Sequence, residues 1–262
     1  MTNPTRVLVT GSAGRLGRAA VKALVTRGHD VVGLDIRPTP GLPAERSFVG
    51  DLTDPATLRD AANGVGCIIH LAATPDDIRY PRGEPPHDGD NFLSDLVPNN
   101  IVGPYHVLET ARTLGIPRLV LASTGQVIDG HLRDGHIPVT PQSAPRPRFL
   151  YACTKVFLEA LGQVYAKEAG LMILAVRLGW CPRDMGQVQE IEAAPRCQDV
   201  YLSPGDAGRF FTAAVEAEGL PPFAIVYATS RFRHDLQYDL TETKRLLGWE
   251  PHDQWPRGAM EW

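Results

Sequence analysis

The chain has 262 residues, 43% of them hydrophobic and 21% charged, and its formal net charge is −4 at pH 7. This composition is typical of a globular protein with a core of its own, and the weakly acidic balance gives no electrostatic support for a nucleic-acid or anionic-membrane partner. Because no apolar run approaches the ~20 residues that span a bilayer, and the first residues do not resemble a signal peptide, we expect no membrane association and a cytoplasmic location.

The spacing of cysteine and histidine predicts no metal site. Four cysteines occur without a C-x-x-C pair, and eight histidines occur without an H-E-x-x-H pattern. A zinc centre or a disulfide framework would need spacing of that kind. We therefore expect most of the cysteines to be small core residues.

A glycine-rich turn separates the first two predicted elements, a strand over 6–10 and a helix over 16–26. The spacing is G-x-x-G-x-x-G. Glycines here allow a sharp bend, close approach of a ligand and tight packing of helix on strand, while the helix start presents N–H groups to a pyrophosphate. The pattern favours a dinucleotide site over a purely structural turn. The expected cofactor contacts are Gly11, Gly14, Arg15, Leu16 and Gly17.

The second strand, predicted over 30–34, is followed by Asp35. An acid at this position accepts hydrogen bonds from the ribose hydroxyls of an adenosine, and its charge would repel a 2′-phosphate. We expect Asp35 and the adjacent Ile36 to contact the cofactor, and we expect NAD rather than NADP. The nearby Arg37 leaves NADP open as the less favoured choice.

Strand and helix patterns continue to alternate along the chain. Further strands are predicted over 46–49, 67–71, 118–122, 172–178 and 224–228, and further helices over 55–62, 91–114, 150–169, 205–217 and 241–247. Such alternation specifies a parallel sheet with helices on both faces. We predict an α/β fold with a Rossmann-type, doubly wound parallel sheet in a single domain over 1–262. Segments 180–205 and 229–262 would form a small C-terminal substrate lobe.

Ligands of such sheets bind beyond the carboxyl ends of the strands. We expect His70, at one of these ends, to be a packed residue rather than a ligand. Two proline-rich segments on this edge, 76–90 and 137–148, would be binding loops or disordered surface. The residues that follow the third and fourth strands complete the expected cofactor contacts: Asp51, Leu52, Leu71, Ala72 and Ala73.

Tyr151 and Lys155 form the sharpest catalytic candidate. Positions i and i+4 share one face of a helix, and an ammonium close to a phenol favours the phenolate. At ~5 Å and an effective dielectric constant of ~20 the attraction is roughly 3 kcal/mol, or about two pKa units. Such a tyrosine can take a proton from a hydroxyl as a hydride leaves the carbon. Ser123 and Thr124, at the end of the preceding strand, would hold the reacting oxygen or simply cap the strand.

Taken together, these motifs resemble the extended branch of the short-chain dehydrogenase/reductase superfamily, the NAD-dependent epimerases and dehydratases. The resemblance implies Tyr151 as the base, Lys155 as its partner and as a ligand of the nicotinamide ribose, and Thr124, which stands three residues before Val127, as the catalytic hydroxyl. It also implies that Asn100 orders the proton path through the lysine, and that helices 91–114 and 150–169 form a homodimer or larger homo-oligomer.

Within this branch the chain is most similar to uronate dehydrogenases, in particular over 151–159, 176–181 and the Leu-Gly-Trp-x-Pro stretch at 247–251. The resemblance implies NAD-dependent oxidation of a hydroxyl or hemiacetal of a small sugar or sugar acid. Segment 123–126 and Trp180 depart from the uronate dehydrogenase pattern. Alternatives are an NAD-dependent epimerase or dehydratase, a carbonyl reductase, and a non-catalytic dinucleotide-binding regulator. The implied substrate contacts are Thr74, Gly125, Gln126 and Arg196.

Overall fold

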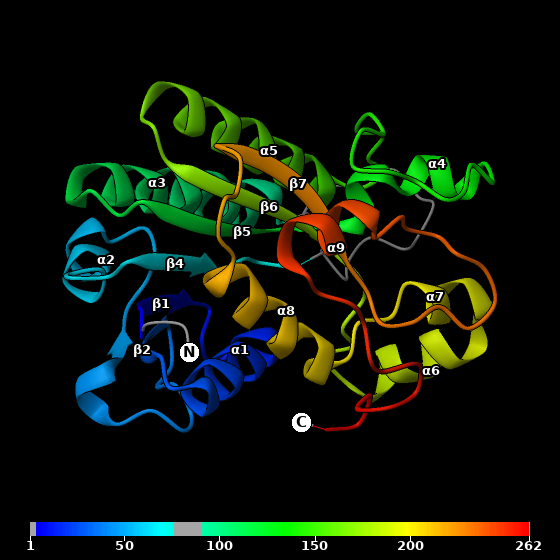
Figure 1. Ribbon diagram of the computed structural model, residues 1–262, viewed down its shortest axis with the longest axis horizontal. Coiled ribbons are helices and arrows are strands. Elements are labelled where there is room, and N and C mark those ends of the chain that lie inside the picture. Colours follow the sequence, from blue (N-terminus) through cyan, green and yellow to red (C-terminus); the bar gives the residue numbers. More distant parts are fainter. Residues whose placement is uncertain (1–3, 76–90, 262) are drawn as a thin grey trace.

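The computed structural model describes residues 4–75 and 91–261. Within them, seven strands form one sheet in the order β3-β2-β1-β4-β5-β6-β7, and every neighbouring pair is parallel (Figure 1). The strands are β1 (Arg6–Thr10), β2 (Asp30–Asp35), β3 (Ser47–Val49), β4 (Cys67–His70), β5 (Arg118–Thr124), β6 (Met172–Leu178) and β7 (Phe223–Ala228). The predicted doubly wound α/β fold is confirmed, and the strand order reverses at β1 and β4.

Helices cover both faces of the sheet. α1 (Arg15–Arg27) and α8 (Pro204–Glu216) pack on one face, where their apolar side chains share a core with Val7 and Val9 of β1. α2 (Pro55–Ala61), α3 (Gly103–Leu114) and α5 (Leu150–Glu168) contribute to a second core with Leu8 of β1. Successive strand residues point to opposite faces, so one short strand supplies both cores. Figure 1 shows the two helical layers on opposite sides of the sheet.

Local signals explain several of the helix ends. The Asp54 side chain accepts a hydrogen bond from the Ala56 N–H at 3.0 Å, and Pro55 occupies the first turn of α2, as predicted. α9 (Thr241–Leu247) ends at Gly248, also as predicted. Asp and Pro at the start of a helix and Gly at its end are general capping signals, so these helix ends could be predicted from the sequence.

The helix predicted over 91–114 differs from the one in the structure. Its first half is two π-helical segments, Phe92–Leu96 and Pro98–Val102, and only the second half is the α-helix α3. Pro98 has no N–H, so it cannot make the hydrogen bond that would continue a regular α-helix through this point. π-Helical turns often occur at functional sites. Segment 137–148 is irregular, as predicted, whereas segment 76–90 lies outside the described residues.

Several elements after β5 were not predicted. They are a 3₁₀ turn over Gly125–Ile128 and the short helices α4 (Asp129–Arg133), α6 (Met185–Ala193) and α7 (Pro195–Asp199). α6 buries only Ile191 among its nine residues, so it lacks the apolar stripe by which a helix is recognised in a sequence.

The segments after β6 and β7 pack together beside the carboxyl ends of the strands, where Figure 1 shows α6 and α7. Ile191, Tyr201, Trp255 and Ala259 form a small core of their own. Asp206, at the start of α8, accepts hydrogen bonds from the His252 and Asp253 N–H groups at 2.8 and 2.9 Å and so anchors the C-terminal segment. That this region binds a substrate stays a prediction. No helix within the described part of the chain is long and apolar enough to cross a membrane.

Candidate active site

The glycine turn lies between β1 and α1 and is packed closely against the residues that follow β4. Gly11 has a φ of +69°, and a Cβ there would lie 2.6 Å from the Ala72 nitrogen; a Cβ on Gly17 would lie 2.1 Å from the Gly11 carbonyl oxygen. A Cβ on Gly14 would meet only that same oxygen within 4 Å, at 3.1 Å. Gly14 also begins α1 without a side-chain cap, and the first N–H groups of a helix have no partner within the helix itself. A pyrophosphate fits this cradle.

Asp35 lies beside this turn. One carboxylate oxygen accepts a hydrogen bond from the Ala13 N–H at 3.0 Å, and the other accepts one from the Arg37 N–H at 3.1 Å. A carboxylate has about four acceptor positions, so Asp35 keeps capacity for ribose hydroxyls while it orders the turn. The neighbouring Ile36 is 69% exposed and offers an apolar surface at the same edge.

The other expected cofactor contacts lie along the same edge of the sheet. Asp51 is exposed and accepts hydrogen bonds from both the N–H and the hydroxyl of Thr53, each at 2.7 Å. Leu52 is buried, whereas the residues after β4 are half-buried. The structure therefore brings these side chains to the edge that the glycine turn occupies: Asp51, Leu52, Leu71, Ala72 and Ala73.

Arg15, the first residue of α1, has unexpected partners. Its guanidinium donates to the carbonyl oxygens of Gly258 and Ala259 at 2.9 and 2.7 Å. These bonds join the start of the glycine-turn helix to the C-terminal segment, more than two hundred residues away in the chain. The side chain thus serves an internal contact, and the helix N–H groups remain the expected cofactor ligands.

Tyr151 and Lys155 lie on successive turns at the start of α5. The Lys155 ammonium nitrogen is 5.5 Å from the centroid of the Tyr151 ring. The lysine side chain is buried, and this burial lowers the pKa of Lys155 to about 8. At pH 7 the ammonium is therefore still mostly charged and able to favour the phenolate of Tyr151.

His70, at the end of β4, is fully buried, and its Nδ1 lies 2.8 Å from the Thr10 hydroxyl. Burial, with a smaller effect from the Lys155 charge, lowers the pKa of His70 to about 3. The imidazole is therefore neutral and packed between β1 and β4, as expected for a strand-end residue.

Thr124 and Ser123, at the end of β5, differ in burial and in hydrogen-bond partners. The Ser123 hydroxyl is buried and donates to Glu159 of α5 at 2.6 Å. Thr124 is half-buried at the strand end, and its hydroxyl accepts a hydrogen bond from the Gln126 N–H at 3.3 Å. This bond caps the 3₁₀ turn over Gly125–Ile128, and a hydroxyl that accepts one hydrogen bond can still donate its proton to a substrate oxygen. Thr124 is thus the better placed of the two for a substrate.

Asn100, in the second π-helical segment, is buried and holds Thr74 by its backbone. Its amide oxygen accepts from the Thr74 N–H at 2.8 Å, and its amide nitrogen donates to the Thr74 carbonyl at 2.9 Å. The Thr74 hydroxyl in turn accepts from the Asn99 amide at 2.8 Å. These bonds fix the chain just after β4, at the ligand-binding edge. The predicted proton path through Asn100 is untested.

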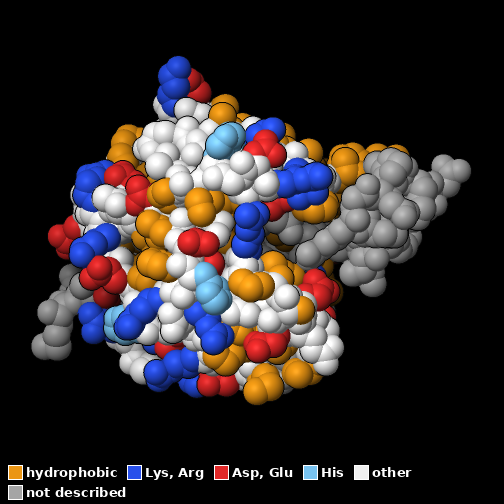
Figure 2. Space-filling model, turned by 90° about the vertical axis from the view of Figure 1, so that its right-hand side faces the viewer, with side chains coloured by type: hydrophobic (Ala, Val, Ile, Leu, Met, Phe, Trp, Pro, Cys, Tyr) orange, Lys and Arg blue, Asp and Glu red, His pale blue; other side chains and the backbone are white. Residues whose placement is uncertain are grey.

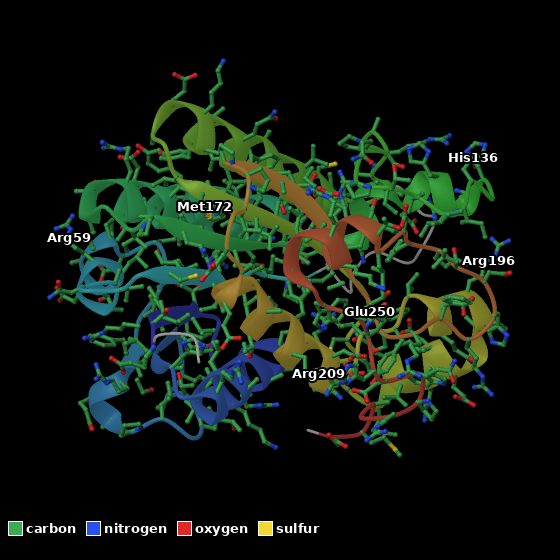
Figure 3. The ribbon with its side chains drawn as sticks, in the orientation of Figure 1. Arg59, His136, Met172, Arg196, Arg209 and Glu250 are labelled. Carbon is green, nitrogen blue, oxygen red and sulfur yellow. The ribbon has the colours of Figure 1, made fainter. Side chains whose placement is uncertain are left out.

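The remaining expected substrate contacts lie in different surroundings. A Cβ on Gly125 would lie 2.0 Å from the Tyr238 hydroxyl, so Tyr238 fills the space beside Gly125. Gln126 is half-buried in the 3₁₀ turn, and Arg196 is exposed on α7 at the right-hand end of the molecule in Figure 3. Arg196 is thus exposed, whereas Thr74, Gly125 and Gln126 are buried or half-buried.

Sequence reasoning missed a buried group behind this site, formed by Glu159, Arg177 and Tyr227. One signal was available, because Glu159 follows Tyr151 by eight residues and so shares its helix face. A second was the single arginine within the apolar run of β6.

No cluster of metal-ligand residues lies at this site or elsewhere in residues 4–75 and 91–261. Figure 2 looks at the face beyond the carboxyl ends of the strands, where basic, acidic and apolar side chains are interspersed. A parallel sheet with a glycine turn at its reversal point, an uncapped helix start and an acid after the second strand defines a Rossmann-type dinucleotide-binding protein.

Comparisons with known proteins agree with this class. The family model described as "NAD dependent epimerase/dehydratase family" matches residues 7–180. An L-arabinose 1-dehydrogenase (NAD(P)(+)) from Haloferax volcanii is 34% identical over 95% of this chain and 96% of its own length. A uronate dehydrogenase from Agrobacterium fabrum is 32% identical over 95% of this chain and 84% of its own.

Solved structures show the same likeness. Uronate dehydrogenase from Agrobacterium tumefaciens, crystallised as a variant complexed with NAD, aligns with a TM-score of 0.74 and 26% identity over 96% of this chain and 86% of its own. Glucuronic acid dehydrogenase from Chromohalobacter salexigens gives the same TM-score with 29% identity over 100% and 87% of the two chains. The chain belongs to the NAD-dependent epimerase/dehydratase family of enzymes, as the sequence resemblance predicted.

Proposed function

We propose that this protein is an NAD-dependent dehydrogenase that oxidises a hydroxyl or hemiacetal of a small sugar or sugar acid. The observation that carries the proposal is the Tyr151–Lys155 pair, with the buried ammonium 5.5 Å from the phenol ring. Relatives named for arabinose, glucuronic acid and uronate as substrates support this class of substrate.

In this proposal Tyr151 is the general base. The Lys155 charge lowers the free energy of its phenolate by roughly 3 kcal/mol at an effective dielectric constant of ~20. Thr124 donates a hydrogen bond to the substrate oxygen and holds it against the phenol, and the proton of that oxygen passes to Tyr151. NAD, when bound, supplies the acceptor for the hydride. Lys155 also holds the nicotinamide ribose, and Asn100 keeps the adjoining chain in place for the proton's path.

The cofactor is held, in the proposal, by residues at the start of α1 and by those that follow the first four strands. Asp35 favours NAD because its carboxylate would repel the 2′-phosphate of NADP. The exposed Arg37 could attract that phosphate, so NADP is the less favoured alternative. The proposed contacts are the set predicted above: Gly11, Gly14, Arg15, Leu16, Gly17, Asp35, Ile36, Asp51, Leu52, Leu71, Ala72, Ala73, Tyr151 and Lys155.

The substrate is proposed to lie between the end of β5 and the C-terminal region, against Thr74, Gly125, Gln126 and, for an acidic sugar, Arg196. Trp180 is half-buried and donates from its indole N–H to Gln187 at 3.3 Å. In the proposal, this bulky side chain narrows the substrate pocket, which would favour a small monosaccharide.

A substrate panel tests this function. The purified protein is mixed with NAD and, separately, with L-arabinose, glucuronate and glucose 6-phosphate, and NADH absorbance is followed. We expect NADH formation with at least one sugar. Cofactor that stays bound through purification, with substrate isomerised and no net NADH, would instead indicate an epimerase. Cofactor binding without any turnover would indicate a regulator.

We further propose a homodimer through α3 and α5. Tyr105 of α3 and Val164 of α5 are 47% and 55% exposed, and Phe157 of α5 is 37% exposed. A contiguous exposed apolar patch marks an interaction site, and the family resemblance implies an interface on these two helices. Light scattering should give twice the monomer mass of 28.6 kDa. A cytoplasmic location stays a prediction.

A further inference from the structure

A buried ion pair lies behind the proposed catalytic residues. The Arg177 guanidinium of β6 meets the Glu159 carboxylate of α5 in a two-bond fork, with Nε–Oε1 and Nη2–Oε2 distances of 2.9 Å each. The side chains are 1% and 6% exposed. The Ser123 hydroxyl of β5 donates to the same Glu159 oxygen at 2.6 Å. One carboxylate therefore links α5 to two adjacent strands.

The remaining nitrogen of Arg177 extends this group further. It donates to the Tyr227 hydroxyl of β7 at 3.1 Å, and that hydroxyl donates to the Thr140 carbonyl at 3.0 Å. The Tyr227 ring is stacked on the Tyr238 ring, with centroids 4.8 Å apart and planes 15° apart. Tyr238 is the residue that fills the space beside Gly125. Hydrogen bonds and this ring stacking together connect α5 to the segment next to Thr124.

The Glu159–Arg177 pair lies where it can position the proposed catalytic residues. Tyr151, Lys155 and Glu159 are spaced by four residues and share one face of α5. Ser123 directly precedes Thr124 on β5. The bonds from Glu159 to Ser123 and Arg177 therefore hold the helix that carries the proposed base against the strand that carries the proposed hydroxyl.

Stability alone does not account for such a pair. Two charges that are removed from water lose about as much solvation free energy as they gain from each other, and apolar residues of similar volume often stabilise a fold as well or better. The planar fork instead fixes a geometry. Fixed geometry matters where a proton moves between two hydroxyls, because a misplacement of ~1 Å costs about 100-fold in rate.

We propose that Glu159 and Arg177, with Ser123, are positioning residues that set the separation of the Tyr151 and Thr124 hydroxyls across the substrate oxygen. This inference rests on the proposed dehydrogenase function. None of the three side chains needs to touch the substrate or the cofactor. Their removal should therefore lower kcat and leave both KM and cofactor affinity close to their original values.

The test compares two variants with the wild type. Glu159→Met combined with Arg177→Met removes both charges together, so that no unpaired charge stays buried. Ser123→Ala removes one hydroxyl and leaves the ion pair intact. The matched control is Glu242→Met with Arg245→Met, which removes an exposed ion pair on α9. For each protein kcat and KM are measured with the best sugar of the panel, and the Kd of NADH by fluorescence.

For the buried double variant we expect kcat to fall about 10- to 100-fold, with KM and the Kd of NADH within about threefold of the wild type. Ser123→Ala should lower kcat less, and the control should leave it unchanged. An unchanged kcat in the folded double variant would overturn the inference, as would a loss in cofactor affinity equal to the loss in kcat. If the double variant does not fold, Ser123→Ala decides by the same criteria. A wild type that turns over no sugar would refute the proposed function itself.

Discussion

The Lys155 ammonium lies 5.5 Å from the centroid of the Tyr151 ring, and Lys155 is only 3% exposed. The buried charge is costly to the fold, because burial lowers the pKa of Lys155 to about 8 from 10.5. A cost of this kind is common at functional sites, where stability is given up for chemistry. It can be measured separately from catalysis.

Lys155→Met should stabilise the protein at neutral pH. The unfolded lysine binds its proton up to a pKa of 10.5 and the folded one only up to about 8. The charged lysine therefore costs stability below pH 8, by about 3 kcal/mol for the 2.5-unit difference. Urea unfolding at pH 7 should show a variant more stable by up to about that amount, and the gain should shrink as pH rises from 8 to 10.5. A variant less stable than the wild type at pH 7 would contradict the buried charge.

His70→Gln should make the protein less sensitive to acid. The pKa of His70 is lowered to about 3 from 6.5, so the unfolded state binds a proton across this range and the folded state does not. Stability from this residue is present above pH 6.5 and falls with a slope of about 1.4 kcal/mol per pH unit as the pH drops below it. Glutamine does not titrate and can still bond to Thr10. Urea unfolding from pH 7 to pH 4 measures the free energy of unfolding of both proteins. An equal loss of this free energy in the wild type and in His70→Gln would refute the assignment.

Two glycines of the turn, Gly17 and Gly14, should respond differently to alanine. Gly17→Ala places a Cβ 2.1 Å from the Gly11 carbonyl oxygen. Because this is a backbone atom that cannot move aside easily, the substitution should lower the free energy of unfolding by about 2 kcal/mol or more. At Gly14 the nearest atom is 3.1 Å away, so Gly14→Ala should cost less than about 1 kcal/mol. Its methyl group would instead project into the proposed pyrophosphate space and weaken NADH binding. Full NADH affinity in folded Gly14→Ala would place the pyrophosphate elsewhere.

Asp35→Ser should shift the cofactor preference. Without the carboxylate there is no charge to repel a 2′-phosphate, and Arg37 is close by in the chain. We expect the ratio of the NADPH and NADH dissociation constants to fall at least about tenfold, which corresponds to about 1.4 kcal/mol. Arg37→Gln serves as the control and should move the ratio the other way. A wild type that binds NADPH more tightly than NADH would overturn the NAD assignment.

The sequence was sufficient for the sheet and for most of the ligand-binding edge. β1, β6 and α9 are predicted to the residue, because each has a clear apolar period or a capping residue at its ends. Short helices with little buried apolar surface, such as α6, gave no such signal.

The spacing of residue types along the sequence does not predict side-chain contacts between residues that are far apart in the chain. Arg15 is paired with carbonyls 243 and 244 residues later in the chain, and Tyr238 lies against Gly125. Both contacts depend on how the C-terminal segments return to the sheet edge. Local patterns do not encode that return, so the sequence predicts Arg15 only as a cofactor contact and Gly125 only as a substrate contact.

The proposed role of Tyr151 is tested most directly by the pair of wild type and Tyr151→Phe, assayed for NADH formation with NAD and the best sugar of the panel. Phenylalanine keeps the ring and removes the group that takes the proton, so kcat should fall about 10²- to 10⁴-fold, while the Kd of NADH stays within about twofold. A Tyr151→Phe protein that oxidises the sugar at the wild-type rate would contradict a tyrosine base.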